Sequence, residues 1–145
     1  MASIEEAIVA LFDADATLQA RFGSRVYDTV LPADGTVVQS YPALTFQVMD
    51  RRDTRHFLGT SKEQFVAVQF DTWGGGDAGT AIAARRNGAA DVRTRLKTWS
   101  GTWGGVLIFR AYKDTDYDTT EDWSDGGPLP SFRNVQRWTV WLREP

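Results

Sequence analysis

The sequence predicts an α+β fold: a mostly antiparallel sheet of about four or five strands, with an N-terminal helix and one long central helix packed on it. Segments in which apolar and polar residues alternate, typical of half-buried strands, follow one another through most of the chain. Segments with apolar residues at helical spacing occur at its start and in its middle. With 145 residues and no linker-like composition, the chain is expected to form a single domain over residues 1–145.

A capping box marks the start of the N-terminal helix, because the Ser3 hydroxyl and the Glu6 carboxylate can accept from free amides there. Asp15 is expected to cap a second, short helical turn that Gly23 ends. Apolar residues at helical spacing give the first helix one buried face. These residues are Ile4, Ala7, Ile8, Leu11 and Phe12.

Alternating segments place the main strands, and polar segments between them are expected to be loops. The strands are predicted at residues 43–50, 65–73, 106–112 and 134–144, with a short edge strand at 25–27. The first polar segment, "RRDTRHFLGTSKE" (51–63), is rich in arginine and is long for a hairpin connection. The second, "DTDYDTTEDWSDGGPLPSF" (114–132), is acidic.

Gly74, Gly76 and Gly79 follow a strand and match the G-x-G-x-x-G pattern of dinucleotide-binding turns. Such a turn needs a second strand that ends in an acidic residue about 20 positions on, which binds the ribose. At that distance the chain is at Thr94, still inside the predicted central helix, and Asp77 would place a carboxylate where the pyrophosphate should bind. The glycines are therefore interpreted as a tight turn, with Asp77 as a helix cap.

The long central helix is predicted over residues 77–99, because apolar residues recur on one of its faces. Gly88, after Asn87, is expected to weaken its middle by about 1 kcal/mol relative to alanine. The apolar face consists of Ala78, Ile82, Ala89, Val92, Leu96 and Trp99.

Composition excludes several classes of function. The net charge of −3 gives no general attraction to nucleic acid or anionic lipid. The chain has no cysteine, so it has no disulfide, thiolate metal site or cysteine nucleophile. No apolar segment approaches the ~20 residues of a membrane span, and the first residues lack the basic start of a signal peptide. We therefore expect no membrane partner and a cytoplasmic site of synthesis.

No catalytic or metal-binding constellation emerges from the motifs. His56, the only histidine, lies in a charged segment without the serine or carboxylate arrangement of a general base. Asp114, Asp116 and Asp118 begin a series at the spacing of a calcium loop, but Thr119 stands where such a loop needs glycine. We predict no enzymatic activity, no cofactor and no metal, and keep a calcium-dependent binding module as an alternative.

The two polar segments differ in charge: residues 51–62 are mainly basic and residues 114–125 are acidic. A molecule with oppositely charged protrusions can dock head to tail on a copy of itself, and such contacts can close into a ring. Two unrelated solvated loops are the alternative interpretation. Tryptophan concentrates at interfaces, which adds Trp123 to the candidates. The candidate interface residues are Arg51, Arg52, Arg55, Lys62, Asp114, Asp116, Asp118, Asp122 and Trp123.

Nearly the whole chain resembles the tail terminator, or tail-completion, family of tailed phages and prophages. The first part, "SIEEAIVALFDADATLQARFGSRVYDTVLP", has the opening helix, the "D-A-x-L" step at Asp15–Leu18 and the "R-V-Y…P" segment that ends at Pro32. The strands "YPALTFQVMD" and "VAVQFDTWGGG", the helix at 77–99 and the aromatic strand "RWTVWLRE" follow in the same order. Order and spacing carry the resemblance, and the 114–131 segment is longer and more acidic than the family pattern.

The resemblance implies a non-enzymatic virion protein that forms a ring, typically hexameric, at the head-proximal end of the tail tube. Such a ring ends tube polymerisation and offers a docking surface for the neck. The implied partners are the protein itself, the tail tube protein and a neck or head-completion protein, while DNA only passes through the lumen. The implied location is the tail or neck of the virion, after assembly in the bacterial host cytoplasm. A neck or head–tail joining ring protein is the closest alternative.

Overall fold

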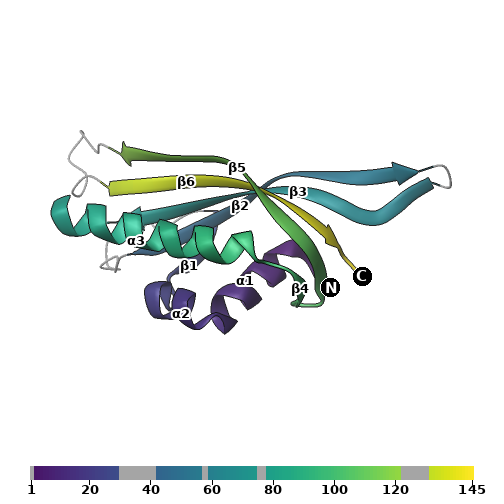
Figure 1. Cartoon of the computed structure of the whole chain (residues 1–145), viewed down its shortest axis with the longest axis horizontal. Helices are drawn as coiled ribbons and strands as arrows, with labels where there is room; N and C mark the ends of the chain where they lie inside the picture. Colours follow the sequence, from purple (N-terminus) through teal and green to yellow (C-terminus); the bar gives the residue numbers. More distant parts are fainter. Residues whose placement is uncertain (1, 30–41, 57–58, 75–77, 122–130) are drawn as a thin grey trace.

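The computed structural model describes residues 2–29, 42–56, 59–74, 78–121 and 131–145. In these residues six strands form one curled sheet with the order β1-β2-β3-β6-β5-β4, and three helices lie on one of its faces (Figure 1). The helices are α1 (Ile4–Ala14), α2 (Ala16–Phe22) and α3 (Ala78–Lys97). The strands are β1 (Val26–Asp28), β2 (Ala43–His56), β3 (Gly59–Gly74), β4 (Gly101–Trp103), β5 (Val106–Glu121) and β6 (Ser131–Arg143).

The predicted fold class is wrong. We expected about four or five mostly antiparallel strands with an N-terminal helix and one long central helix as the main features. The described chain is instead dominated by a six-stranded mixed sheet, in which β1 pairs in parallel with β2. The β4 strand and the distal parts of β2, β3 and β5 carry little apolar alternation, which is why the sequence pattern underestimated the sheet.

The β2 and β3 strands continue through the segment that we predicted as a basic loop. They pair as far as His56 and Gly59, so only residues 57–58 connect them. This distal hairpin, residues 50–63, extends beyond the helices (Figure 1), and Asp50–Asp53 are exposed. No helix covers most of this hairpin, so the backbone ladder is its main support, and the alternation that marks a half-buried strand is lost.

The β5 strand likewise continues through the first part of the predicted acidic loop. It pairs with β6 over Leu107–Glu121, with register shifts between Ile108 and Arg110 and between Lys113 and Thr115. Residues 122–130, which include the candidates Asp122 and Trp123, lie outside the described residues.

The core lies between the helices and one face of the sheet. Phe12 of α1 packs edge-on against Phe22 of α2, with ring centroids 6.0 Å apart, and stacks on Phe70 of β3 at 6.4 Å. The predicted capping box is confirmed, since the Ser3 amide donates to Glu6 Oε2 at 2.9 Å and the Glu6 amide donates to Ser3 Oγ. All five residues of the predicted apolar stripe are buried, so this part of the pattern did locate the core.

Gly88 lets α3 approach the sheet closely. A Cβ atom at this position would lie 2.8 Å from Thr72 Cγ2 of β3 and 3.2 Å from Phe22 Cζ of α2. The sequence identified Gly88 only as a weak point of the helix, whereas the tertiary structure uses its missing side chain for packing.

The described sheet topology gives the glycine pattern no βαβ unit, while Gly76 and the predicted cap Asp77 lie outside the described residues. The β3 strand, which ends at Gly74, has only antiparallel neighbours in the described sheet, β2 and β6. The α3 helix leads to β4 at the sheet edge rather than to a parallel strand beside β3. A βαβ unit, which such a site requires, is therefore not formed there.

Candidate assembly surfaces

The predicted basic residues lie on the distal hairpin and differ in their surroundings. Arg51 is bound within the chain, because its Nη2 lies 2.9 Å from Glu5 Oε1 of α1 and its Nη1 lies 3.0 Å from Glu144 Oε1. Arg52 pairs with Asp50 at 2.9 Å, yet its side chain is 80% exposed. Lys62 is exposed. Arg55 is the second-last residue of β2.

Two carboxylates bind Arg51, and their effect on its pKa is opposite to that of burial. Partial burial lowers the pKa of the Arg51 guanidinium, but the hydrogen bonds and charges of Glu5 and Glu144 outweigh it, so the pKa lies above its ordinary value. Burial also raises the pKa of the Glu5 carboxyl, and hydrogen bonds from its own backbone amide, Ser3 and Arg51 reverse the shift to below the usual range. Arg51 thus joins α1, β2 and the residue after β6 in one charged contact.

The predicted acidic residues of β5 do not act as one group. Asp114 accepts from Thr139 Oγ1 at 2.6 Å on the face of the sheet that carries no helix. Asp116 and Asp118 face α3, where Arg93 Nε lies 2.7 Å from Asp116 Oδ2 and Arg85 Nη2 lies 3.6 Å from Asp118 Oδ2. A strand that divides the three carboxylates between two faces cannot wrap them around one ion as a calcium loop does.

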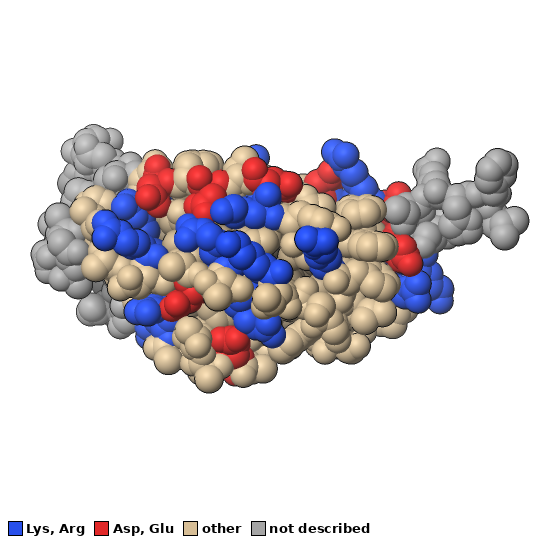
Figure 2. Space-filling model, in the orientation of Figure 1, with Lys and Arg blue, Asp and Glu red and all other residues tan. Residues whose placement is uncertain are grey.

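The helix-side acids are largely neutralised by arginines of the same chain. Figure 2 shows basic side chains over α3 beside acidic side chains along the adjoining edge of the sheet. Burial raises the pKa of the Asp116 carboxyl, but hydrogen bonds from Arg93 and Asn134 outweigh it and hold this pKa below its usual range. The structure gives Asp116 and Asp118 an intramolecular role, and the interface role expected of them stays a prediction.

A chain of buried polar side chains continues inward from these acids along β6, and sequence reasoning missed it. Asn134 Nδ2 donates to Asp116 Oδ1 and to Asp118 Oδ1, both at 2.9 Å. Gln136 Nε2 donates to Asn134 Oδ1 and to the carbonyl of Ala89 in α3, each at 3.0 Å. Trp138 Nε1 in turn donates to Gln136 Oε1 at 3.0 Å.

The sequence contains a pattern that could have predicted these buried polar side chains. Positions 134 and 136 have the same parity as the apolar residues Trp138, Val140 and Leu142, which are buried. Two amides on the buried face of a strand predict a hydrogen-bonded network, because buried polar groups need partners.

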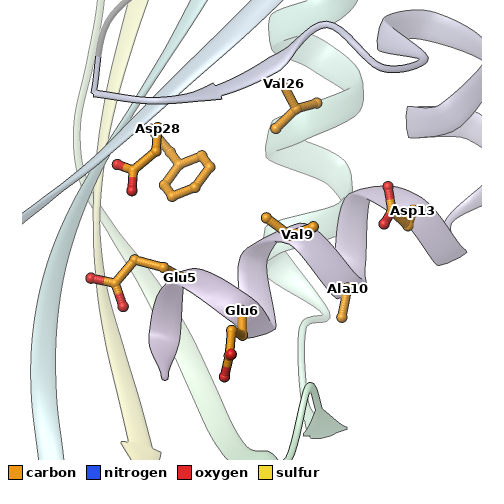
Figure 3. Close-up of a pocket in the computed structure, with 8 residues that line it drawn as sticks. Glu5, Glu6, Val9, Ala10, Asp13, Val26 and Asp28 are labelled. Atoms are coloured by element: carbon orange, nitrogen blue, oxygen red, sulfur yellow. The ribbon is translucent and has the colours of Figure 1, made fainter. Parts of the chain in front are cut away.

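The described surface also contains a shallow groove between α1 and β1, with a volume of about 430 Å³. Val9 and Val26 face each other across it in Figure 3, and Ala10 and Phe46 complete its apolar lining. Acidic side chains from α1 and β1 surround these apolar residues. No sequence pattern indicates this groove, because it joins residues from α1, β1 and β2.

Within the described part of the chain, no group of three or more His, Asp or Glu side chains is placed to hold a metal ion. No described helix is both long enough and apolar enough to cross a bilayer. The described surface has a protruding charged hairpin, a sheet face without a helix and a shallow groove.

No protein-family model matches the sequence, and no curated protein matches it either. Among solved structures, the chain is similar to a chain of a "Virion of native gene transfer agent (GTA) particle", with a TM-score of 0.69 and 16% sequence identity. The match covers 98% of this chain and 95% of that chain. At this identity the likeness shows a shared fold along nearly the full length of both chains.

Proposed function

We propose that this protein is a structural component of a phage or phage-like virion. The observation that carries the proposal is the full-length fold match to a chain of a gene transfer agent particle, since a match over 98% of this chain leaves no large part unaccounted for. The resemblance of the sequence to tail terminators points to the same class of particle.

More specifically, we propose that it forms a ring, by analogy hexameric, at the head-proximal end of the tail tube. There it ends tube polymerisation and presents a surface to the neck. In this role it acts through shape and charge, without catalysis, cofactor or metal. The protruding hairpin and the separate acidic groove on one subunit are consistent with head-to-tail contacts that close into a ring.

Two measurements test the proposal. Native mass spectrometry and negative-stain images of the purified protein should show closed rings rather than monomers or open filaments. Addition of the protein to polymerising tail tube protein of the same particle should cap tube ends and stop elongation at substoichiometric ratios to tube protein. Rings that bind the portal side but not tube ends would instead support a neck or head–tail joining role.

A further inference from the structure

We infer that the groove between α1 and β1 is the seat of the distal β2–β3 hairpin of a second copy of this chain. The inference rests on the proposed function, because it specifies the contact by which subunits join. The groove offers an apolar floor, and the charges around it select a basic partner.

The rim of the groove is strongly acidic. Its four acids are Glu5, Glu6, Asp13 and Asp28, and no basic residue lines it. The α1 helix itself carries no basic residue. Of the four, Glu5 binds Arg51 and Glu6 belongs to the capping box, whereas Asp13 and Asp28 have no ion pair among the described residues.

The negative charge of Asp13 lies at an unfavourable position in α1. It lies in the last turn of α1, where the helix macrodipole is negative, and this turn contains no basic residue. A cation from another molecule would remove this repulsion. Val9, on the same helix, is 44% exposed, so the groove also leaves apolar surface in water.

The distal hairpin has the complementary chemistry. Residues 51–62 contain four basic residues and one acidic residue, and Arg52 and Lys62 are exposed. In the sequence, the two residues between the strands are Phe57 and Leu58, where a two-residue hairpin connection ordinarily has Asn, Asp or Gly. An apolar pair between basic residues matches an apolar groove with an acidic rim.

The groove cannot be filled by the hairpin of its own chain. The described strands of the hairpin extend beyond the helices (Figure 1), and the hairpin reaches the groove of its own chain through Arg51 at its base, which binds Glu5. Groove and hairpin are therefore two different surfaces of one subunit, and their contact between copies is heterologous, the kind that generates rings.

The test uses two charge-reversal variants. D13K/D28K reverses the charge at the two groove acids that have no ion pair among the described residues, and R52E/K62E reverses the charge at the two exposed basic residues of the hairpin. R86E/K97E makes the same charge change as R52E/K62E on exposed residues of α3 and serves as its control. Each of the first two variants alone should raise the dissociation constant of self-association at least about tenfold, measured by sedimentation velocity. The control variant should assemble like the parent protein.

A mixture of the two variants provides the decisive test. In an equimolar mixture of D13K/D28K and R52E/K62E, the lysines of the substituted groove can meet the glutamates of the substituted hairpin, and the unchanged groove can meet the unchanged hairpin, so assembly should return. Parent-like assembly of D13K/D28K alone, or monomers in the mixture, would overturn the inference and leave the proposed function standing. Normal rings of D13K/D28K that no longer bind tube ends would assign the groove to the tube protein instead. A parent protein that neither self-associates nor caps tubes would refute both proposals.

Discussion

Arg93 of α3 and Asp116 of β5 form an ion pair between helix and sheet, with Nε and Oδ2 2.7 Å apart. Both side chains are mostly buried, at 30% and 17% exposure, and the same carboxylate also accepts from Asn134. An acid expected in a solvated loop thus fixes the long helix to the sheet.

Replacement of Asp116 by alanine should lower the free energy of unfolding by about 1–3 kcal/mol, because it leaves Arg93 Nε without its acceptor and removes one of the acceptors of Asn134. Urea denaturation would measure this. The matched control is Asp50→Ala, which breaks a pair with Arg52 whose side chains are 52% and 80% exposed and should cost less than about 1 kcal/mol. Equal losses in the two variants would contradict the assigned role of Asp116.

The lowered pKa of Asp116 predicts a pH dependence of stability. A carboxyl whose pKa is lower in the folded than in the unfolded protein stabilises the fold above its unfolded pKa, about 3.9 for Asp. This contribution is lost as the pH falls from there through the folded pKa. The Asp116→Asn variant should therefore show a shallower loss of stability below about pH 4 than the parent protein. Identical acid profiles would refute this prediction.

Gly88→Ala should destabilise the protein, although alanine favours an exposed helix by about 1 kcal/mol. The added methyl would lie 2.8 Å from Thr72 Cγ2, so the packing of α3 on β3 must shift, at a cost of about 1–3 kcal/mol. Thermal melting would report the loss. Asn87→Ala, at the exposed neighbouring position, should be neutral or slightly stabilising, and a gain in melting temperature for Gly88→Ala would show that α3 lies farther from the sheet.

Gln136→Leu should cost about 2–3 kcal/mol even though leucine is more apolar and similar in size. The substitution leaves Trp138 Nε1 without its acceptor and removes the Gln136 donor from Asn134 Oδ1 and from the Ala89 carbonyl, all at the buried helix–sheet contact. Denaturant unfolding would measure the loss. Combining it with Trp138→Phe, which removes the stranded indole N–H, should cost less than the sum of the single changes.

The sequence allowed some of the local structure to be predicted and much less of the surfaces. Local sequence patterns predict two features correctly, because each depends on neighbours within a few positions. They are the capping box of Ser3 and Glu6 and the shared buried face of Trp138, Val140 and Leu142. The basic and acidic segments were identified as charged, but both were assigned to loops. Strands that leave the core keep their backbone hydrogen bonds and lose their apolar pattern, so periodicity could not detect them.

By itself, the sequence determined that the chain has no cysteine, that it combines helices and strands around an apolar core, and that its charge is divided between a basic and an acidic segment. Only the tertiary structure decided which charges are available to a partner. It set Arg93 against Asp116, and it assembled a groove from α1, β1 and β2 around Val9 and Val26. The physical reason is that helix capping and strand alternation depend on residues close in sequence, whereas an ion pair or a groove depends on distances between distant segments, which packing alone fixes.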